Sequence, residues 1–409
     1  MLKYFQDLGE RIEKAWHRAD FDVASFPSIC CEALEASPVH RAVSTEDILR
    51  WALSSRRLPE QHDPEAKFGE PPITLHLGHG FFIAVNLWLT STPAIHNHSF
   101  SGAFQVLEGG SLETNFRFSG SRAVNDHMVL GKLKALNCGV LTTGSTRPIV
   151  AGRTIHALFH LEHPSATIIV RTGRDPSARP QLVYWRSGVG IDTLYNPAEL
   201  LRRKQLLTFV HRTAPERLVP TCLRYMTGAD FVSRFAVLRH CGMLLAPAEA
   251  DSLLQRAKRV DGVVAALASD VLECERREAF LIRRRAPIKD PDLRFFLALL
   301  LNVRGRVDAL ALIKRRYPRK DPIALVLNWV RALDRSPGPE DGSSSALGFP
   351  LDDVLLGMLE GALRGRTPTA IVRSIERTAG RSLTKSDVKD LQSLRAALQQ
   401  SEIFRYLLE

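Results

Sequence analysis

The amino-acid sequence predicts a multidomain α+β fold, in which an antiparallel β-barrel or jelly roll follows N-terminal helices and precedes an all-α domain. Two observations carry this prediction. Between about residues 71 and 192, short runs rich in Val, Ile, Thr and aromatic residues end at turn-forming residues, as in compact antiparallel barrels. On both sides of that segment, apolar residues instead recur every three or four positions. We therefore expect domains at 1–70, 71–192 and 193–409.

Two helices are expected before the barrel. The first spans residues 1 to about 20, and the second begins after Ser44, an N-cap residue followed by acidic residues in the first turn. We expect both to pack on the barrel. The apolar stripe of the first helix consists of Leu2, Phe5, Leu8, Ile12 and Trp16.

Eight strand-like runs make up the expected barrel. Each is short, and each closes at Gly, Pro, Asn or Ser, so the chain has frequent places to reverse direction. The runs are ITLHLGHG, FFIAVNLWLT, AIHNHSFSGAFQVLEGG, SLETNFRFSG, HMVLGKLKALNCGVLTTG, TIHALFHLEH, SATIIVRTG and PQLVYWRSG.

The C-terminal part is predicted to be helical and basic. Its helical runs include several that start at Asp-Pro or Thr-Pro, a common beginning for a helix. The sequence RSPGPEDGSSSALGF at 335–349 has the composition of a flexible loop within this domain.

The overall composition excludes several classes of protein. A chain of 409 residues with 45% hydrophobic and 24% charged residues is too apolar for intrinsic disorder and long enough for two or three cores. It has no apolar stretch of about 18 residues and no signal-peptide pattern at its start, so we expect a cytoplasmic protein without a membrane partner. The six cysteines form no CxxC pair, and reduced, mostly buried thiols are expected.

The net charge of +11 arises entirely in the C-terminal half. The first 200 residues carry 19 Lys and Arg against 20 Asp and Glu, and the rest carry 36 against 24. Nucleic-acid binding is one interpretation, supported by a weak helix-turn-helix pattern around Gly380. Covering the barrel or forming a homodimer interface is the more economical one. The basic patches are 202–204, 283–285 and 314–316 with Arg319 and Lys320.

Histidines, in contrast, gather in the first half, and three of them have the spacing of a metal site. His96 and His98 are two residues apart in a predicted strand, so both imidazoles lie on one face. His156 begins another strand about 60 residues later. Three neutral imidazoles on adjoining strands can hold one face of a metal ion and leave the opposite positions open.

This pattern resembles the cupin superfamily over roughly residues 70–190. The HxH pair is followed by a glycine turn at Gly109 and Gly110, and His156 stands for the second motif. Cupins usually place a glutamate four or five residues after the second histidine, where this chain has Gly102 and Ala103. The missing carboxylate makes the segment similar to the three-histidine thiol dioxygenases related to cysteine dioxygenase. That resemblance implies Fe(II) held by His96, His98 and His156, which binds substrate and O2 together.

The sequence departs from the animal cysteine dioxygenases at their cysteine–tyrosine crosslink. Ala103 stands in place of the cysteine, Gly173 in place of the tyrosine and Arg171 in place of a nearby histidine, so the crosslink cannot form. If Arg171 points inward, its planar guanidinium can hold a substrate carboxylate. His160 shares strand parity with His156 and is the second candidate for a catalytic or substrate contact, the alternative being a structural histidine.

Three functional hypotheses follow. The first is a mononuclear non-haem Fe(II) dioxygenase or oxygenase that acts on a small thiol- or carboxylate-bearing molecule; Zn, Ni and Mn are alternative metals, because imidazoles accept all of them. The second is a ligand-sensing or regulatory protein whose basic helices bind nucleic acid or a protein partner. The third is a structural barrel that holds no metal.

Overall fold

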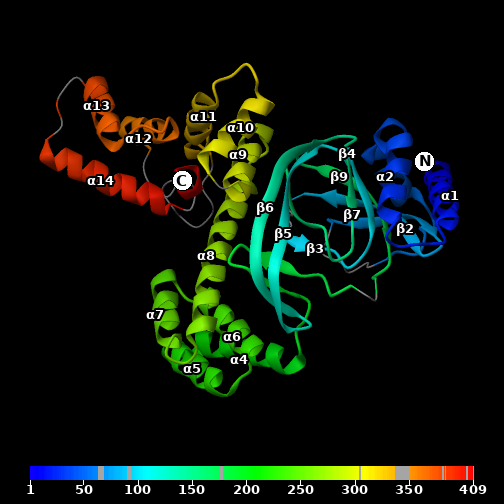
Figure 1. Ribbon diagram of the computed structural model, residues 1–409, viewed down its shortest axis with the longest axis horizontal. Coiled ribbons are helices and arrows are strands. Elements are labelled where there is room, and N and C mark those ends of the chain that lie inside the picture. The colour runs from blue at the N-terminus through cyan, green and yellow to red at the C-terminus, as the bar shows by residue number, and fades with distance from the viewer. Residues whose placement is uncertain are drawn as a thin grey trace.

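The computed structural model describes residues 1–62, 69–89, 94–175, 178–303, 305–336, 351–379, 382, 384–401 and 404–408. Figure 1 shows N-terminal helices on one side of a β-barrel and a large set of C-terminal helices on the other. The long helix α8 runs between two groups of these C-terminal helices. The predicted fold class, a barrel with N-terminal helices and a helical C-terminal part, is therefore confirmed.

The barrel consists of two antiparallel sheets. The first has the order β1-β2-β9-β4-β7, and the second closes on itself in the order β10-β11-β6-β5-β8-β3. The predicted run from Ala94 to Gly110 divides into β3 and β4, and the sequence patterns did not predict β7 and β11. The bounds are β1 Pro72–Gly78, β2 Phe81–Trp88, β3 His96–Asn97, β4 Gly102–Glu108, β5 Gly110–Asn125, β6 Met128–Thr142, β7 Thr146–Ile149, β8 Ile155–His160, β9 Ser165–Thr172, β10 Val183–Trp185 and β11 Val189–Ile191.

The N-terminal helices cover the outer face of the first sheet (Figure 1). They are α1 Leu2–Arg18, α2 Phe26–Ala36 and α3 Thr45–Ser54, with a 3-10 turn at Val39–Arg41. Ser44 caps α3 in a capping box with Asp47, as its sequence predicts. Four of the five residues predicted as the apolar stripe of α1 (Phe5, Leu8, Ile12 and Trp16) pack with α2 against outward-facing strand residues, whereas Leu2 is exposed. This layer shields one sheet from water. The shared core includes Phe5, Leu8, Phe26, Ile83 and Ile168.

The C-terminal helices pack against the second sheet through two shared cores. Met128, Trp185 and Val189 join the core of α4 to α8, while Phe159 and Leu161 join the core of the later helices. The bounds are α4 Ala198–Thr213, α5 Leu218–Gly228, α6 Phe231–Leu244, α7 Pro247–Ala257, α8 Gly262–Arg285, α9 Pro291–Asn302, α10 Arg306–Arg316, α11 Pro322–Asp334, α12 Asp353–Leu363, α13 Pro368–Ala379, α14 Lys385–Gln400 and α15 Arg405–Leu408, with a 3-10 turn at Pro215–Arg217.

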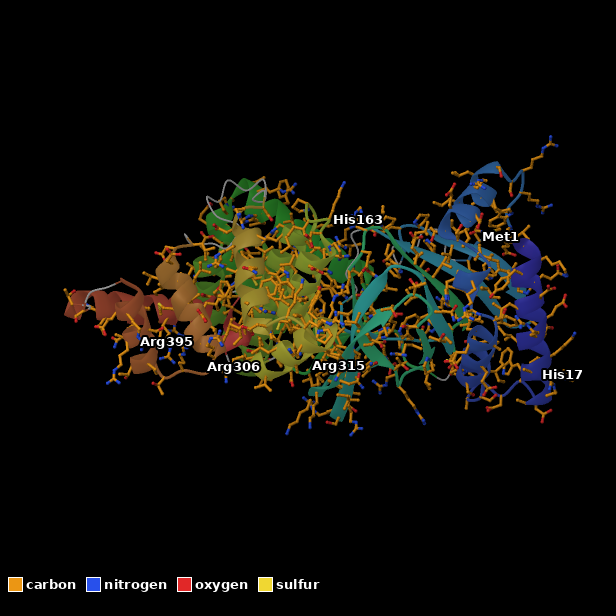
Figure 2. All side chains as sticks on the ribbon, turned by 90° about the horizontal axis from the view of Figure 1, so that it is seen from above. Met1, His17, His163, Arg306, Arg315 and Arg395 are labelled. Carbon is orange, nitrogen blue, oxygen red and sulfur yellow. The ribbon has the colours of Figure 1, made fainter. Side chains whose placement is uncertain are left out.

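The structure changes the interpretation of one basic patch. Arg284 and Arg285 are buried, with relative exposures of 6% and 1%, so the patch at 283–285 presents only Arg283 to solvent. Arg315, by contrast, is exposed, and Figure 2 shows it on the helical side of the molecule, far from the N-terminus. Nucleic-acid binding through the remaining patches stays a prediction.

The structure can be compared with three further expectations, which concern the loop at 335–349, the cysteines and membrane-spanning helices. The expected loop at 335–349 lies outside the described residues except for Arg335 and Ser336. All six cysteines are free thiols; Cys30, Cys222 and Cys241 are buried and the others half-buried. Among the helices described, none combines the length and apolar character needed to cross a membrane.

Candidate metal centre

The structure brings the three predicted histidines together inside the barrel. His96 lies on β3 directly opposite His156 on β8, and His98 follows β3 by one residue. Each is only 2% exposed. One ligand nitrogen from each ring lies within 4.8 Å of the other two, and this is the one such group found among the described residues. The arrangement results from the pairing of β3 with β8, which brings together residues about 60 positions apart in the chain.

The hydrogen bonds of the three rings show which nitrogens face the centre. His96 donates from Nδ1 to the carbonyl of Ala94 at 2.8 Å, and His156 donates from Nδ1 to the carboxylate of Glu113 at 3.0 Å. Both Nε2 atoms therefore carry lone pairs. Nε2 of His98 lies 3.0 Å from Nε2 of His156, a separation at which the two nitrogens share a proton or a cation.

The environment keeps two of the imidazoles neutral. Burial lowers the pKa of His96 to about 3, and the neighbouring His156 adds to this shift. Burial also lowers the pKa of His98 well below its usual range, with further contributions from His96, His156 and Arg171. Because a metal binds the neutral form of imidazole, these rings need not release a ring proton to the solvent on binding at neutral pH. The donor set therefore fits a divalent transition metal.

Glu113 is the functional residue that sequence reasoning missed. It lies on β5, is 4% exposed, and bridges His156 and Arg147, whose Nε is 3.1 Å from the second carboxylate oxygen. Burial raises its pKa, but the hydrogen bond from His156 and the charge and hydrogen bond of Arg147 outweigh this, so the net shift is downward. An ionised carboxylate behind a metal-binding histidine fixes its tautomer and orientation. The sequence did offer one indication of this residue: in the run SLETNF, alternation places the acidic Glu113 on the same strand face as Ser111.

The structure explains why no carboxylate follows the HxH pair. A Cβ atom at Gly102 would lie 2.0 Å from the carbonyl oxygen of Val170, so this close strand contact excludes any side chain. Ala103 is fully buried in the core between the first sheet and the N-terminal helices, on the opposite face from the histidines. Neither position can supply a ligand without a change in the backbone.

Arg171 lies on the interior face of the first sheet. On β9 it has the same parity as Ile169, an interior residue, and it is paired in register with Phe82. Its guanidinium carbon lies 3.9 Å from the ring centroid of Phe100 and 5.0 Å from that of Phe82. The ring of Phe100 in turn contacts His98, with centroids 4.9 Å apart. The charge of Arg171 thus stands one aromatic ring away from the histidine group and is half-buried.

His160 is inside the barrel but outside the ligand group. It is 1% exposed and stacks on Trp88, with ring centroids 4.5 Å apart. Its Nδ1 is 3.0 Å from the hydroxyl of Ser111, and its carbonyl oxygen accepts hydrogen bonds from the C-terminal helices. Burial lowers its pKa to about 3, assisted by the charges of Arg285 and Arg294. These contacts hold the ring rigidly, and a direct contact with substrate stays a prediction.

Gln105 on β4 is fully buried, and its side chain lies outside the group of three histidines. Its side chain faces the N-terminal helices, where Oε1 accepts from the backbone amide of Val39 at 2.8 Å and Nε2 donates to the carbonyl of Leu34 at 3.0 Å. It joins the helical layer to the barrel. The interior positions of β4 are instead Phe104 and Val106, which lie in the apolar interior of the barrel.

Comparison with known proteins adds only distant structural likenesses. No family model matches the chain, and no curated protein matches it. Among solved structures, a cupin-2 domain protein from Shewanella frigidimarina is 11% identical, covering 32% of this chain and 96% of its own, with a TM-score of 0.20. An oxalate oxidase is 15% identical, covering 38% of this chain and 74% of its own, with a TM-score of 0.23.

A third likeness is to a hydroquinone 1,2-dioxygenase crystallised with Cd2+ and 4-hydroxybenzonitrile. It is 13% identical and covers 25% of this chain and 63% of its own, with a TM-score of 0.20. Scores this far below 0.5 support no conclusion about activity. The fold assignment rests on the strand order, and the candidate metal centre rests on the three histidines.

Proposed function

We propose that this protein is a metal-dependent oxygenase in which His96, His98 and His156 hold one Fe(II) ion inside the barrel. The observation that carries the proposal is the convergence of three buried imidazoles within 4.8 Å of one another, with the Glu113 carboxylate behind one of them. No carboxylate belongs to this ligand group, in agreement with the three-histidine pattern. The resemblance to thiol dioxygenases supports Fe(II) over Zn, Ni and Mn, which imidazoles also bind.

The residues around the site would divide the work of binding and orienting the substrate. When bound, Fe(II) would supply the redox chemistry for dioxygen and a coordination position for a substrate donor atom. Glu113 holds the tautomer of His156, and Arg171 offers a cation for a carboxylate one aromatic ring away from His98. Phe100 and Phe104 line the apolar interior next to the histidines and exclude water. We therefore propose a small carboxylate-bearing molecule, with or without a thiol, as substrate.

Metal analysis and oxygen uptake test this proposal together. Anaerobically reconstituted protein should contain about one Fe(II) per chain and consume O2 when small carboxylates and thiols are screened as substrates. His156→Ala should lose both the iron and the oxygen consumption. His163→Ala is the matched control, because His163 is exposed just beyond β8, at the position labelled in Figure 2. Full iron occupancy in His156→Ala, or no metal in the unmodified protein, would overturn the proposal.

A further inference from the structure

The C-terminal helices reach the barrel at the end of β8. Arg285, the last residue of α8, donates from Nη2 to the carbonyl oxygen of His160 at 3.2 Å. Arg294, in the first turn region of α9, donates from Nη2 to the same oxygen at 3.0 Å and from Nη1 to the carbonyl of Ile288 at 3.2 Å. Side chains from two helices thus converge on one backbone oxygen of the barrel, and Arg294 also binds the turn between these helices.

Both guanidinium groups are deeply buried. Arg285 and Arg294 are each 1% exposed, and the guanidinium carbon of Arg285 lies 4.5 Å from the ring centroid of Phe159. Burial lowers the pKa of Arg285 to about 9, and the neighbouring Arg294 contributes to the shift. The charge of Glu70 acts on Arg285 and that of Glu162 on Arg294, and both partly offset the cost of burying two neighbouring cations. Apolar contacts through Phe159 and Leu161 already join these helices to the barrel, so docking alone does not require the arginines.

The same strand carries the candidate metal ligand. His156 and His160 lie on the interior face of β8, and each is held by a residue of the adjacent strand β5: Glu113 bonds His156, and Ser111 bonds His160. Ser111 lies directly opposite His160 in the register, whereas Glu113 reaches His156 diagonally. A shift of β8 along β5 would therefore disturb both hydrogen bonds at once.

We propose that Arg285 and Arg294 are positioning residues that fix the end of β8 from the helical region and thereby hold His156 in the geometry for metal binding. The inference rests on the proposed function, since it assigns a role toward that same site. It gives the C-terminal helices a function within the barrel: they add a contact at His160 to the strand pairing that β5 and β3 already provide for β8. The arginines act through the backbone of His160 and do not contact the metal.

Cobalt(II) is the probe for the test, because its visible absorption reports ligand geometry independently of activity. Arg294→Met retains the length of the side chain but removes its hydrogen bonds, and it should raise the Co(II) dissociation constant about 10-fold and shift the absorption bands. Arg294→Lys keeps a charge with donors and should restore part of the affinity. Arg283→Met, in the neighbouring exposed arginine, is the matched control and should match the unmodified protein.

The outcomes separate this inference from the proposed function. If the unmodified protein binds no Co(II), the metal-centre proposal fails, and the inference fails with it. If the unmodified protein binds Co(II) and the Arg285→Met and Arg294→Met variants have the same affinity and spectrum, only the inference is overturned. Should Arg294→Met not fold, as judged by near-ultraviolet circular dichroism, Arg294→Lys and Arg285→Met provide the same comparison.

Discussion

The carboxylate of Glu113 accepts a hydrogen bond from Nδ1 of His156 at 3.0 Å, although 43 residues separate them in the chain. Its other oxygen pairs with Arg147, a half-exposed residue of β7, at 3.1 Å. This chain of contacts connects the buried histidine group with the outer part of the barrel. It also defines the tautomer of His156, because an ionised carboxylate can only accept.

Replacing Glu113 with Gln should weaken metal binding by about 10- to 100-fold, because the amide no longer stabilises Nδ1–H of His156 as an ionised carboxylate does. The change is nearly isosteric, so the barrel should remain folded. Competition with a chromophoric chelator gives the dissociation constant. Glu108→Gln, on the exposed end of β4, is the control and should bind as the unmodified protein does. Equal affinities in the two variants would mean that Glu113 does not support the ligand.

Replacing Arg171 with Met should abolish the effect of small carboxylates on the spectrum of the Co(II)-loaded protein, while Co(II) binding itself is retained. The guanidinium is the cation that stacks on Phe100, next to His98, so its removal leaves a carboxylate without its partner. Arg171→Lys should restore the response only in part, because a lysine cannot form the bidentate pair. Arg174→Met, in the exposed segment after β9, serves as the control. A normal response in Arg171→Met would contradict the assignment.

Replacing Gly102 with Ala should destabilise the protein by about 2 kcal/mol or more, because the added methyl group meets the carbonyl of Val170 at 2.0 Å. For the same reason, Gly102→Glu should not create a fourth, carboxylate ligand. Urea unfolding measures the first effect and metal affinity the second. Gly139→Ala is a suitable control, since its Cβ meets no atom within 4 Å. A stable Gly102→Glu protein with tighter metal binding would show that the strands can separate here.

Strand alternation and turn residues are local signals, so they were sufficient to predict the barrel and the shared face of His96 and His98; the resemblance to the cupin superfamily supplied the expectation that His156 meets them. His96 and His98 were expected to share a face by alternation, but β3 ends at Asn97, so this alternation does not continue into β4, where Ala103 and Gln105 face the N-terminal helices. Whether the three histidines bind a metal stays a prediction.

The supporting residues could not be predicted, because they depend on which strands and helices become neighbours. The contact of Glu113 with His156 follows from the register between β5 and β8. Local sequence patterns do not determine this register, because the two strands are distant in the chain. The arginine run at 283–285 has the composition of a solvated surface, yet Arg285 is buried once the α8–α9 corner docks on β8. No periodic pattern in the sequence marks a charged residue that becomes buried between the helices and the barrel.

The buried histidines should make the metal-free protein less stable as the pH falls from neutral, and His160 offers the clearest test because it is not a ligand. Its pKa is about 3 in the folded protein, against an ordinary value of 6.5, so only the unfolded chain takes up its proton between these values. Stability is therefore retained above pH 6.5 and lost below it. Between pH 7.5 and 5.5 the loss from His160 amounts to about 1.4 kcal/mol.

His160→Gln should reduce this pH dependence by that amount, as measured by urea unfolding in the presence of a chelator at both pH values. The comparison is needed because Glu278 acts in the opposite direction: burial, with the charge of Glu275, raises its pKa to about 7, so the folded state takes up a proton there and gains stability as the pH falls. That contribution is common to both proteins and cancels in the difference. If both proteins lose the same stability between pH 7.5 and 5.5, then the folded protein does not hold the ring of His160 in its neutral form.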